Sequence, residues 1–145
     1  MRLDTTTRFG FRLMVNIAQA DTIKSLAVIS KEENISRKYL EQIILKLRKS
    51  GIIIGFKGIS GGYKLKIPAS KISLFKIYKA LEGQDHILFC LDNKQANCNN
   101  QKNCKTNKLW QCLDNDIRKT LNRYSLADLI NDKKSFNGSG DSHVK

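Results

Sequence analysis

The chain lacks the features that would direct it into or across a membrane. No apolar run reaches the ~18 residues that cross a bilayer, and residues 1–10 contain no apolar stretch of the kind found in signal peptides. We therefore expect a cytoplasmic protein that does not enter a membrane. Structural disulfides are rare in that compartment, so the four cysteines raise a question of metal or redox chemistry.

Motifs for catalysis are missing as well. The sequence holds no paired acid–base constellation, no nucleophile elbow and no phosphate-binding loop. The glycine-rich stretch 58–62 lacks the Walker lysine and does not lie between a strand and a helix in the required order. We therefore expect no enzymatic activity and no small-molecule substrate.

Acidic residues are scarce relative to basic ones. The chain has 26 Lys and Arg but 13 Asp and Glu, a formal net charge of +13. Residues 1–85 carry 16 basic and 7 acidic side chains, whereas residues 86–145 carry 10 and 6. An excess concentrated in the first part is typical of a module that binds a polyanion. Composition alone is equally compatible with a charge that keeps the protein soluble, or with a genome rich in Lys and Asn.

Proline occurs once, and the elements before it form a recognisable order. Apolar spacing predicts a helix over 5–20, a short helix from Leu26 capped by Ser25, and a third helix that ends at Gly51. Two β-strands are expected over 52–56 and 63–67, joined by a glycine-rich loop and closed by Pro68. A fourth helix over 73–81 should pack on the first. This order predicts a mainly α fold with a small β-hairpin, a winged helix-turn-helix domain over residues 1–83.

The third helix carries the candidate DNA-reading residues. Its apolar side chains recur with helical spacing at Leu40, Ile43, Ile44 and Leu47. The second helix of a helix-turn-helix reads the major groove with its N-terminal residues, which here are Ser36, Arg37, Lys38, Tyr39, Glu41 and Gln42.

Glu41 is the most informative of these residues. A carboxylate that faces DNA repels phosphates but can accept from a cytosine amino group; a pair with Lys46, or a solvated position, is an equal alternative. Lys57 and Gly58 of the hairpin loop, with Arg2 and Arg8 near the first helix, are further candidate contacts to DNA.

All four cysteines lie between positions 90 and 112, three of them in the polar segment 84–104. Their order is C-x7-C-x5-C-x7-C, without the C-x2-C pairs of structural zinc sites. The spacing also differs from the common ferredoxin runs. On spacing alone these residues are clustered thiols that serve metal or redox chemistry.

A long amphipathic helix is expected over 105–124, with a short helix after the capping box at Ser125–Asp128. Its apolar face has no evident partner in its own domain, so we expect it to form a homodimer. Intrachain packing on the first helix is the alternative use of the same face. The candidate dimer residues are Leu109, Trp110, Leu113, Ile117, Leu121 and Tyr124. Residues 105–131 thus form a dimerisation unit, and residues 132–145 are expected to be disordered.

Three stretches together resemble the Rrf2 superfamily of bacterial winged-helix repressors, of the IscR, NsrR and RirA type. They are MRLDTTTRFG at the start, YLEQIILKLRKSGII in the third helix and KGISGGYKL in the hairpin. The resemblance implies a homodimer on a two-fold related operator in double-stranded DNA, with Tyr39 and Glu41 at the family's reading positions. The family's wing usually carries Arg-Gly where this chain has Lys57-Gly58, which predicts a relaxed sequence preference there.

The resemblance also implies an iron–sulfur cluster, [2Fe-2S] or [4Fe-4S]. Family members that sense iron, nitric oxide or cluster status hold it with three cysteines just before the long helix, and Cys90, Cys98 and Cys104 occupy that place. The position of the histidine ligand of IscR-like members is Asn107 here, a poor iron ligand, and the position of the NsrR-like carboxylate is Arg8.

The fourth ligand is therefore open. Its candidates are Cys112, His86, Asn107, a carboxylate of the partner subunit or a small exogenous ligand. Cys112 lies beside Leu109 and Leu113, so we expect it to be a small buried hydrophobe, and we expect His86 to be a polar loop residue. A disulfide switch that uses the same cysteines without iron is the alternative means of control.

Overall fold

A computed structural model describes residues 3–91, 98, 100, 103–131 and 136, and it confirms the mainly helical fold with one antiparallel hairpin. The helices are α1 (Thr5–Gln19), α2 (Leu26–Glu33), α3 (Arg37–Lys49), α4 (Leu74–Glu82), α5 (Asn107–Arg123) and α6 (Leu126–Asn131). Strands β1 (Ile53–Phe56) and β2 (Gly62–Leu65) form the hairpin, and η1 (Ala69–Lys71) and η2 (Phe89–Leu91) are short 3-10 turns. Among the described helices, none combines the length and apolar character needed to cross a membrane.

Helix α1 runs through the middle of the fold and contacts α2, α3, α4 and α6. Its inward side chains, Leu13, Met14 and Ile17, are at most 1% exposed. The predicted packing of α4 on α1 is confirmed, and Gly10 permits it: a Cβ at this position would lie 2.4 Å from Cδ1 of Leu81. A side chain at position 10 would therefore displace the Leu81 side chain from its place between the two helices.

The turn between α2 and α3 is fixed by local capping. Ser25 and Ser36 each accept a hydrogen bond at the start of their helix, from the N–H of Val28 and of Tyr39. Asn34 ends α2 in the left-handed conformation, with φ of 53°, which an asparagine adopts more readily than most residues. The caps set the angle at which α3 leaves α2.

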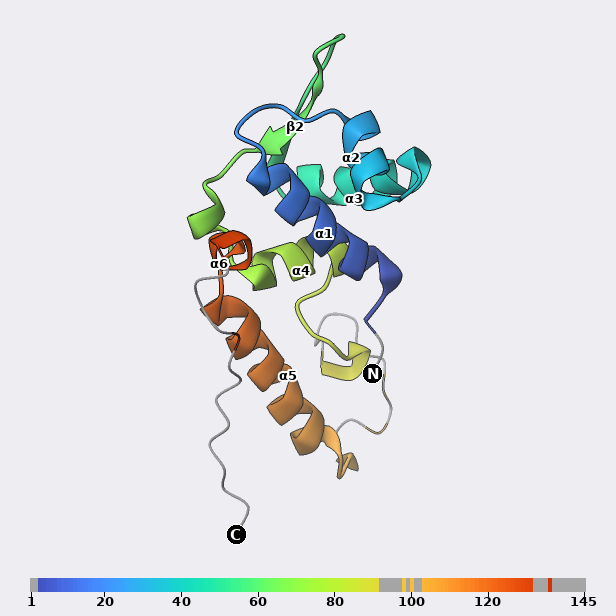
Figure 1. The fold of residues 1–145 in the computed structure, drawn as a ribbon. Coiled ribbons are helices and arrows are strands. Elements are labelled where there is room, and N and C mark those ends of the chain that lie inside the picture. Colours follow the sequence, from blue (N-terminus) through green and yellow to red (C-terminus); the bar gives the residue numbers. More distant parts are fainter. Residues whose placement is uncertain (1–2, 92–97, 99, 101–102, 132–135, 137–145) are drawn as a thin grey trace.

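The hairpin is anchored to the connection between α1 and α2. Strand register pairs Ile53 with Leu65 and Phe56 with Gly62. Lys24 and Tyr63 exchange backbone hydrogen bonds of 3.0 and 2.9 Å, which adds a third strand-like segment beside β2. Gly62 is required here because a Cβ would lie 2.2 Å from the Lys24 carbonyl oxygen. The hairpin therefore projects from a fixed base (Figure 1).

Helix α5 lies at the end of the molecule opposite the hairpin (Figure 1). The predicted capping box after it is confirmed, because the Ser125 N–H donates to Asp128 and the Asp128 N–H donates to the Ser125 hydroxyl oxygen. Leu126 of α6 is fully buried in the main core. The short helix that sequence reasoning grouped with α5 therefore packs on α1. Except for Phe136, the segment 132–145 lies outside the described residues.

Candidate functional site

Helix α3 and the hairpin line one groove. The groove brings together four of the residues that the sequence singled out, Arg37, Glu41, Lys57 and Gly58. Arg37 and Glu41 come from the N-terminal half of α3, and the other two come from the hairpin loop. A surface that combines a helix N-terminal half with a projecting hairpin has the geometry of a winged helix-turn-helix that reads DNA.

The orientation of α3 follows from its apolar face. Leu40, Ile43, Ile44 and Leu47 are at most 2% exposed, so the opposite face of the helix is turned to solvent. Arg37, Lys38, Glu41 and Gln42 are exposed, as predicted from the spacing. Lys46 donates a hydrogen bond of 2.8 Å to the Leu81 carbonyl oxygen, so this lysine binds α4 where sequence reasoning offered it as a partner for Glu41.

Two of the predicted reading residues have structural contacts inside the chain. Ser36 is exposed, but its hydroxyl oxygen caps α3. The Tyr39 hydroxyl lies 2.9 Å from Thr6 Oγ1, and its ring meets that of Phe9 edge-on at 5.8 Å. Both contacts hold Tyr39 against α1, so only part of its side chain faces outward. Arg8 is exposed on α1, and Arg2 lies outside the described residues.

Sequence reasoning missed further groove residues, of which Arg48 is the most important. It lines the groove together with residues 25–27 at the start of α2. The signal was present in the spacing, since Arg37, Glu41 and Arg48 recur at intervals of four and seven and so share one helix face. With Lys57, these arginines give the groove three cationic side chains beside one carboxylate.

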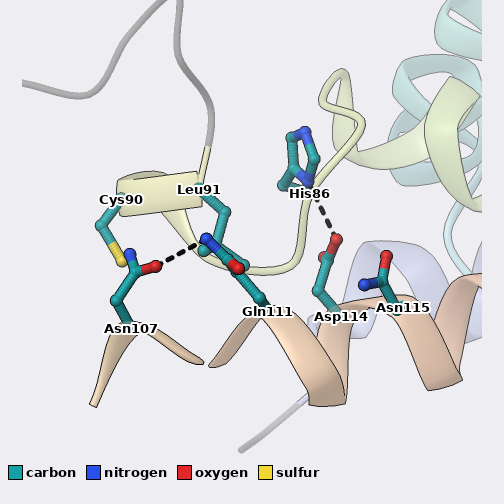
Figure 2. Close-up of a pocket in the computed structure, with 7 residues that line it drawn as sticks. All are labelled: His86, Cys90, Leu91, Asn107, Gln111, Asp114 and Asn115. Carbon is teal, nitrogen blue, oxygen red and sulfur yellow. Dashed lines mark hydrogen bonds and ion pairs between the residues drawn. The ribbon is translucent and has the colours of Figure 1, made fainter. Parts of the chain in front are cut away.

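The second candidate site is a cavity of about 240 Å³ between α5 and the segment that precedes it. Figure 2 shows Cys90 of this segment facing the start of α5, where Asn107 and Gln111 project toward it. His86 and Asp114 line the opposite end of the same cavity. Two of the three named fourth-ligand candidates, His86 and Asn107, therefore share a cavity with Cys90.

Cys104 lies directly before α5. The Thr106 hydroxyl lies 3.3 Å from its sulfur, and this contact, followed by the backbone N–H groups of Thr106 and Asn107, lowers the pKa of the Cys104 thiol. Donors aimed at a sulfur favour its thiolate, the form that binds metals and attacks disulfides. None of the four cysteines is in a disulfide.

The thiols are suitable iron ligands, but the structure does not gather them into a site. Across residues 3–91, 98, 100 and 103–131, no three Cys, His, Asp or Glu side chains lie close enough to hold a metal ion. Cys98 is exposed, and its neighbours 92–97 and 99 lie outside the described residues. The donor chemistry of Cys90, Cys98 and Cys104 therefore fits a cluster, whereas their described positions do not assemble one.

The prediction that Cys112 is buried is wrong. The side chain is exposed on α5, with its sulfur 3.9 Å from Asp116 Oδ2. Helix α5 turns the opposite face, which includes Asp114, toward the protein, and this orientation leaves Cys112 in solvent. Cys112 is also not among the residues that line the Cys90 cavity.

The apolar residues of α5 divide into two groups. Leu109 and Leu113 are 59% and 37% exposed, whereas Trp110, Ile117 and Leu121 are half-buried against their own chain. Tyr124 was expected in the dimer face, but it is 7% exposed within its own chain. Its carbonyl oxygen accepts a hydrogen bond from the Leu74 N–H at 3.0 Å. The helix ends before Tyr124, and the extended backbone there turns the ring inward.

Comparison with known proteins identifies relatives over almost the full chain. The profile of the Rrf2 family, described as "Iron-dependent Transcriptional regulator", matches residues 3–132. A Haemophilus influenzae protein named as a candidate HTH-type transcriptional regulator is 38% identical over 90% of this chain and 87% of its own. The HTH-type transcriptional regulator IscR of Escherichia coli is 31% identical over 99% and 89%.

Solved structures agree with the sequence relatives. CymR, the "Global Cysteine Regulator" of B. subtilis, superimposes with a TM-score of 0.73 at 26% identity. The match covers 92% of this chain and 99% of that one. The likeness therefore extends from the end that carries α3 and the hairpin, called the DNA-facing end below, to α5.

Proposed function

The chain belongs to the Rrf2 family of transcriptional regulators, and from this premise we propose that it is a homodimer that binds an operator in double-stranded DNA. In this proposal α3 reads the major groove, the hairpin follows the backbone or the minor groove, and the cysteine-bearing segment controls binding. Repression is the mode that we propose, by blocking access to the operator.

The observation that carries the DNA-binding proposal is the shared groove of α3 and the hairpin. Arg37 and Arg48 supply guanidinium groups that can pair with guanine or phosphate, and Glu41 supplies an acceptor suited to cytosine. Lys57 at the hairpin adds a charge that suits a phosphate strand. An acceptor between cations is the arrangement expected of a surface that both attracts DNA and discriminates between bases.

The dimer proposal rests on the uncovered part of α5. Leu109 and Leu113 are one helical turn apart, and both remain exposed in the single chain. Two exposed leucines in a line on a long helix are best covered by the same face of a second copy. A two-fold dimer would also present two copies of α3, which matches a two-fold related operator.

For control we propose an iron–sulfur cluster held by Cys90, Cys98 and Cys104, with His86 or Asn107, which line the same cavity as Cys90, as the candidate fourth ligand. The support is the thiol donor set before α5, the iron-dependence in the family's description and the relation to IscR. A bound cluster would supply a centre that reacts with oxidants or is lost when iron is scarce. The chain's own part is to hold the thiols at the start of α5, where Thr106 favours the thiolate of Cys104.

A thiol switch without iron is the second candidate. The observation that favours it is the likeness to CymR, a protein described as a cysteine regulator. Anaerobic purification followed by visible absorption, iron and sulfide assays separates the two: a cluster gives bound iron and sulfide, whereas a thiol switch gives an iron-free protein that forms disulfides on oxidation. Cys98→Ser should abolish either signal, and Cys112→Ser is the matched control.

DNA binding is tested by selecting bound duplexes from fragmented genomic DNA, followed by affinity measurement across a salt series. For a duplex, log K falls with log salt by about 0.9 for each phosphate contact. Arg37→Ala and Glu41→Ala should weaken the selected site about tenfold, since one base contact is worth about 1–3 kcal/mol. Arg123→Ala is the control, because this arginine is exposed at the C-terminal end of α5 and does not line the groove. Equal affinity for all sequences in all variants would refute the reading role of α3.

A further inference from the structure

Helix α5 meets the rest of its chain with half-buried apolar side chains and one buried charge. Asp114 is the one buried side chain of this helix, with 2% of its surface exposed. Burial of a carboxylate is costly unless hydrogen bonds and opposite charges compensate for the lost water. The neighbours of Asp114 therefore show which contacts compensate for its burial.

Both carboxylate oxygens bind the segment that leads to Cys90. His86 Nδ1 donates to Oδ2 at 2.9 Å, and the backbone N–H of Ile87 donates to Oδ1 at 2.8 Å. Figure 2 shows the His86–Asp114 contact at one end of the cavity that Cys90 lines at the other. One side-chain contact and one backbone contact together fix both the position and the orientation of this segment relative to α5.

A third contact extends the joint to α4. Arg118, one turn after Asp114 on α5, lies 3.9 Å from Oδ2, and its guanidinium lies over the ring of Phe75 of α4 at 5.1 Å from the ring centre. A single carboxylate thus connects α5, the segment 84–91 and α4. Of the three contacts described for the carboxylate, two are made by residues 86 and 87 of the segment and one by Arg118.

We propose that Asp114 is the positioning residue that transmits displacement of residues 84–91, the segment that carries Cys90, to α5. The regulatory half of this inference rests on the proposed function, and the joint itself rests on the contacts above. If chemistry at the thiols displaces this segment, either Asp114 stays buried without its hydrogen-bond donors or α5 moves with the segment. A buried carboxylate without donors costs more free energy, so we expect the segment and α5 to move together.

Asp114→Asn tests the joint because it keeps the shape of the side chain and removes the charge. The readout is alkylation of Cys90 by N-ethylmaleimide in reduced, iron-free protein, measured by mass spectrometry against the exposed Cys112 of the same molecule. We expect the Cys90 rate to rise about tenfold, as for the loss of one hydrogen bond to a charged group. Arg118→Gln, which leaves the carboxylate in place, should produce a smaller rise.

The matched control is Asp85→Asn. Asp85 lies in the same segment, but its side chain is half-exposed and paired with Lys79 at 2.6 Å, so its loss should leave Cys90 labelling unchanged. Equal labelling of Cys90 in Asp114→Asn and wild type would overturn the joint. A parallel loss of amide-exchange protection throughout α3 would also overturn it, because Asp114 would then serve overall stability alone.

The regulatory link has its own readout. The ratio of DNA affinities between the two thiol states, reduced and oxidised or iron-free and iron-loaded, should move toward one in Asp114→Asn. The affinity of the reduced iron-free form should stay at the wild-type value. An unchanged ratio alongside faster Cys90 labelling would overturn the link to α5. A wild-type ratio of one would instead refute control by the thiols in the proposed function, whereas the labelling result would still decide the joint.

Discussion

Helices α3 and α5 have similar sequence patterns but are held in the fold in different ways. Each is basic at its exposed face and carries aliphatic residues four apart. Four of the five aliphatic side chains of α3 are at most 2% exposed, whereas the single buried side chain of α5 is Asp114. One helix is therefore attached by fully buried apolar side chains, whereas the other is attached by half-buried apolar side chains and one buried, hydrogen-bonded charge.

The difference bears on the function of each end. Apolar packing is insensitive to the chemical state of distant groups and gives a rigid platform, which suits a surface that must match the groove of DNA. A buried carboxylate is stable only while its donors stay in place. The position of α5 therefore depends on the segment 84–91, whereas the position of α3 does not.

The largest effect is expected from a substitution in the apolar face of α3. Ile43 is fully buried, so Ile43→Ala should lower the free energy of unfolding by about 2–5 kcal/mol. Leu45→Ala on the same helix is the control, since Leu45 is 65% exposed and surface changes cost within about 0.5 kcal/mol. Urea denaturation measures both. Similar losses in the two variants would mean that α3 is not held by its apolar face.

The base of the hairpin offers a more local disruption. In Gly62→Ala the new Cβ would clash with the Lys24 carbonyl oxygen. Moving the two backbone segments apart to relieve the clash would break both backbone hydrogen bonds between Lys24 and Tyr63. The expected loss is about 1–3 kcal/mol, for two hydrogen bonds, with weaker DNA binding. Cys90 alkylation at the other end should stay unchanged. A simultaneous rise in Cys90 labelling would show that the two ends do not behave separately.

The next prediction concerns the exposed face of α5. Leu113→Glu should convert the proposed dimer to a monomer, because a charge would replace an apolar contact in the proposed interface. The unfolding free energy of the monomer should change within about 0.5 kcal/mol. Sedimentation velocity measures the assembly. A variant that remains dimeric would exclude Leu113 from the interface, and Lys119→Ala, exposed on the same helix, is the control.

The smallest expected effect on stability concerns Tyr78 of α4, which lies near Glu82 and Asp114. Burial, with the negative charges of Glu82 and Asp114, raises the pKa of this phenol above its ordinary value of 10.0. The folded state therefore favours the protonated phenol. Its contribution to stability is complete below pH 10 and is lost as the pH rises through the pKa of the folded state.

Absorbance at 295 nm should resolve one of the four tyrosines ionising later than the others. Tyr78→Phe should remove that late step together with its part of the alkaline loss of stability. Asp114→Asn should shift the late step to lower pH. Ionisation of all tyrosines in one step would contradict the raised pKa.

Much of the DNA-facing end follows from the sequence. The Ser25 cap, Gly51, the four buried aliphatic residues of α3 and the glycine hairpin each have a local cause, and the structure has each of them at the expected place. Arg37, Glu41, Lys57 and Gly58 were predictable because they lie on the face opposite the apolar one or at the tip of a hairpin. Arg48 was readable from the same periodicity and was missed.

The α5 end was harder to predict because several faces of that helix carry apolar residues. Trp110, Asp114, Ile117 and Leu121 share one face, and Leu109 and Leu113 share the next. Sequence reasoning treated them as one interface and expected Cys112 inside it. The acidic residue within the first set was the available signal that this face meets polar partners from elsewhere in the chain.

By itself, the sequence determined which segments are helices, where they are capped and where the hairpin turns, because these depend on neighbours within a few residues. The tertiary structure decided which face of α5 is covered, that Tyr124 and Leu126 join the main core, and that His86 and Ile87 meet Asp114. These contacts link residues 27 or more positions apart. The sign of a buried charge's contribution depends on whether such distant donors arrive, and local spacing carries no information about that.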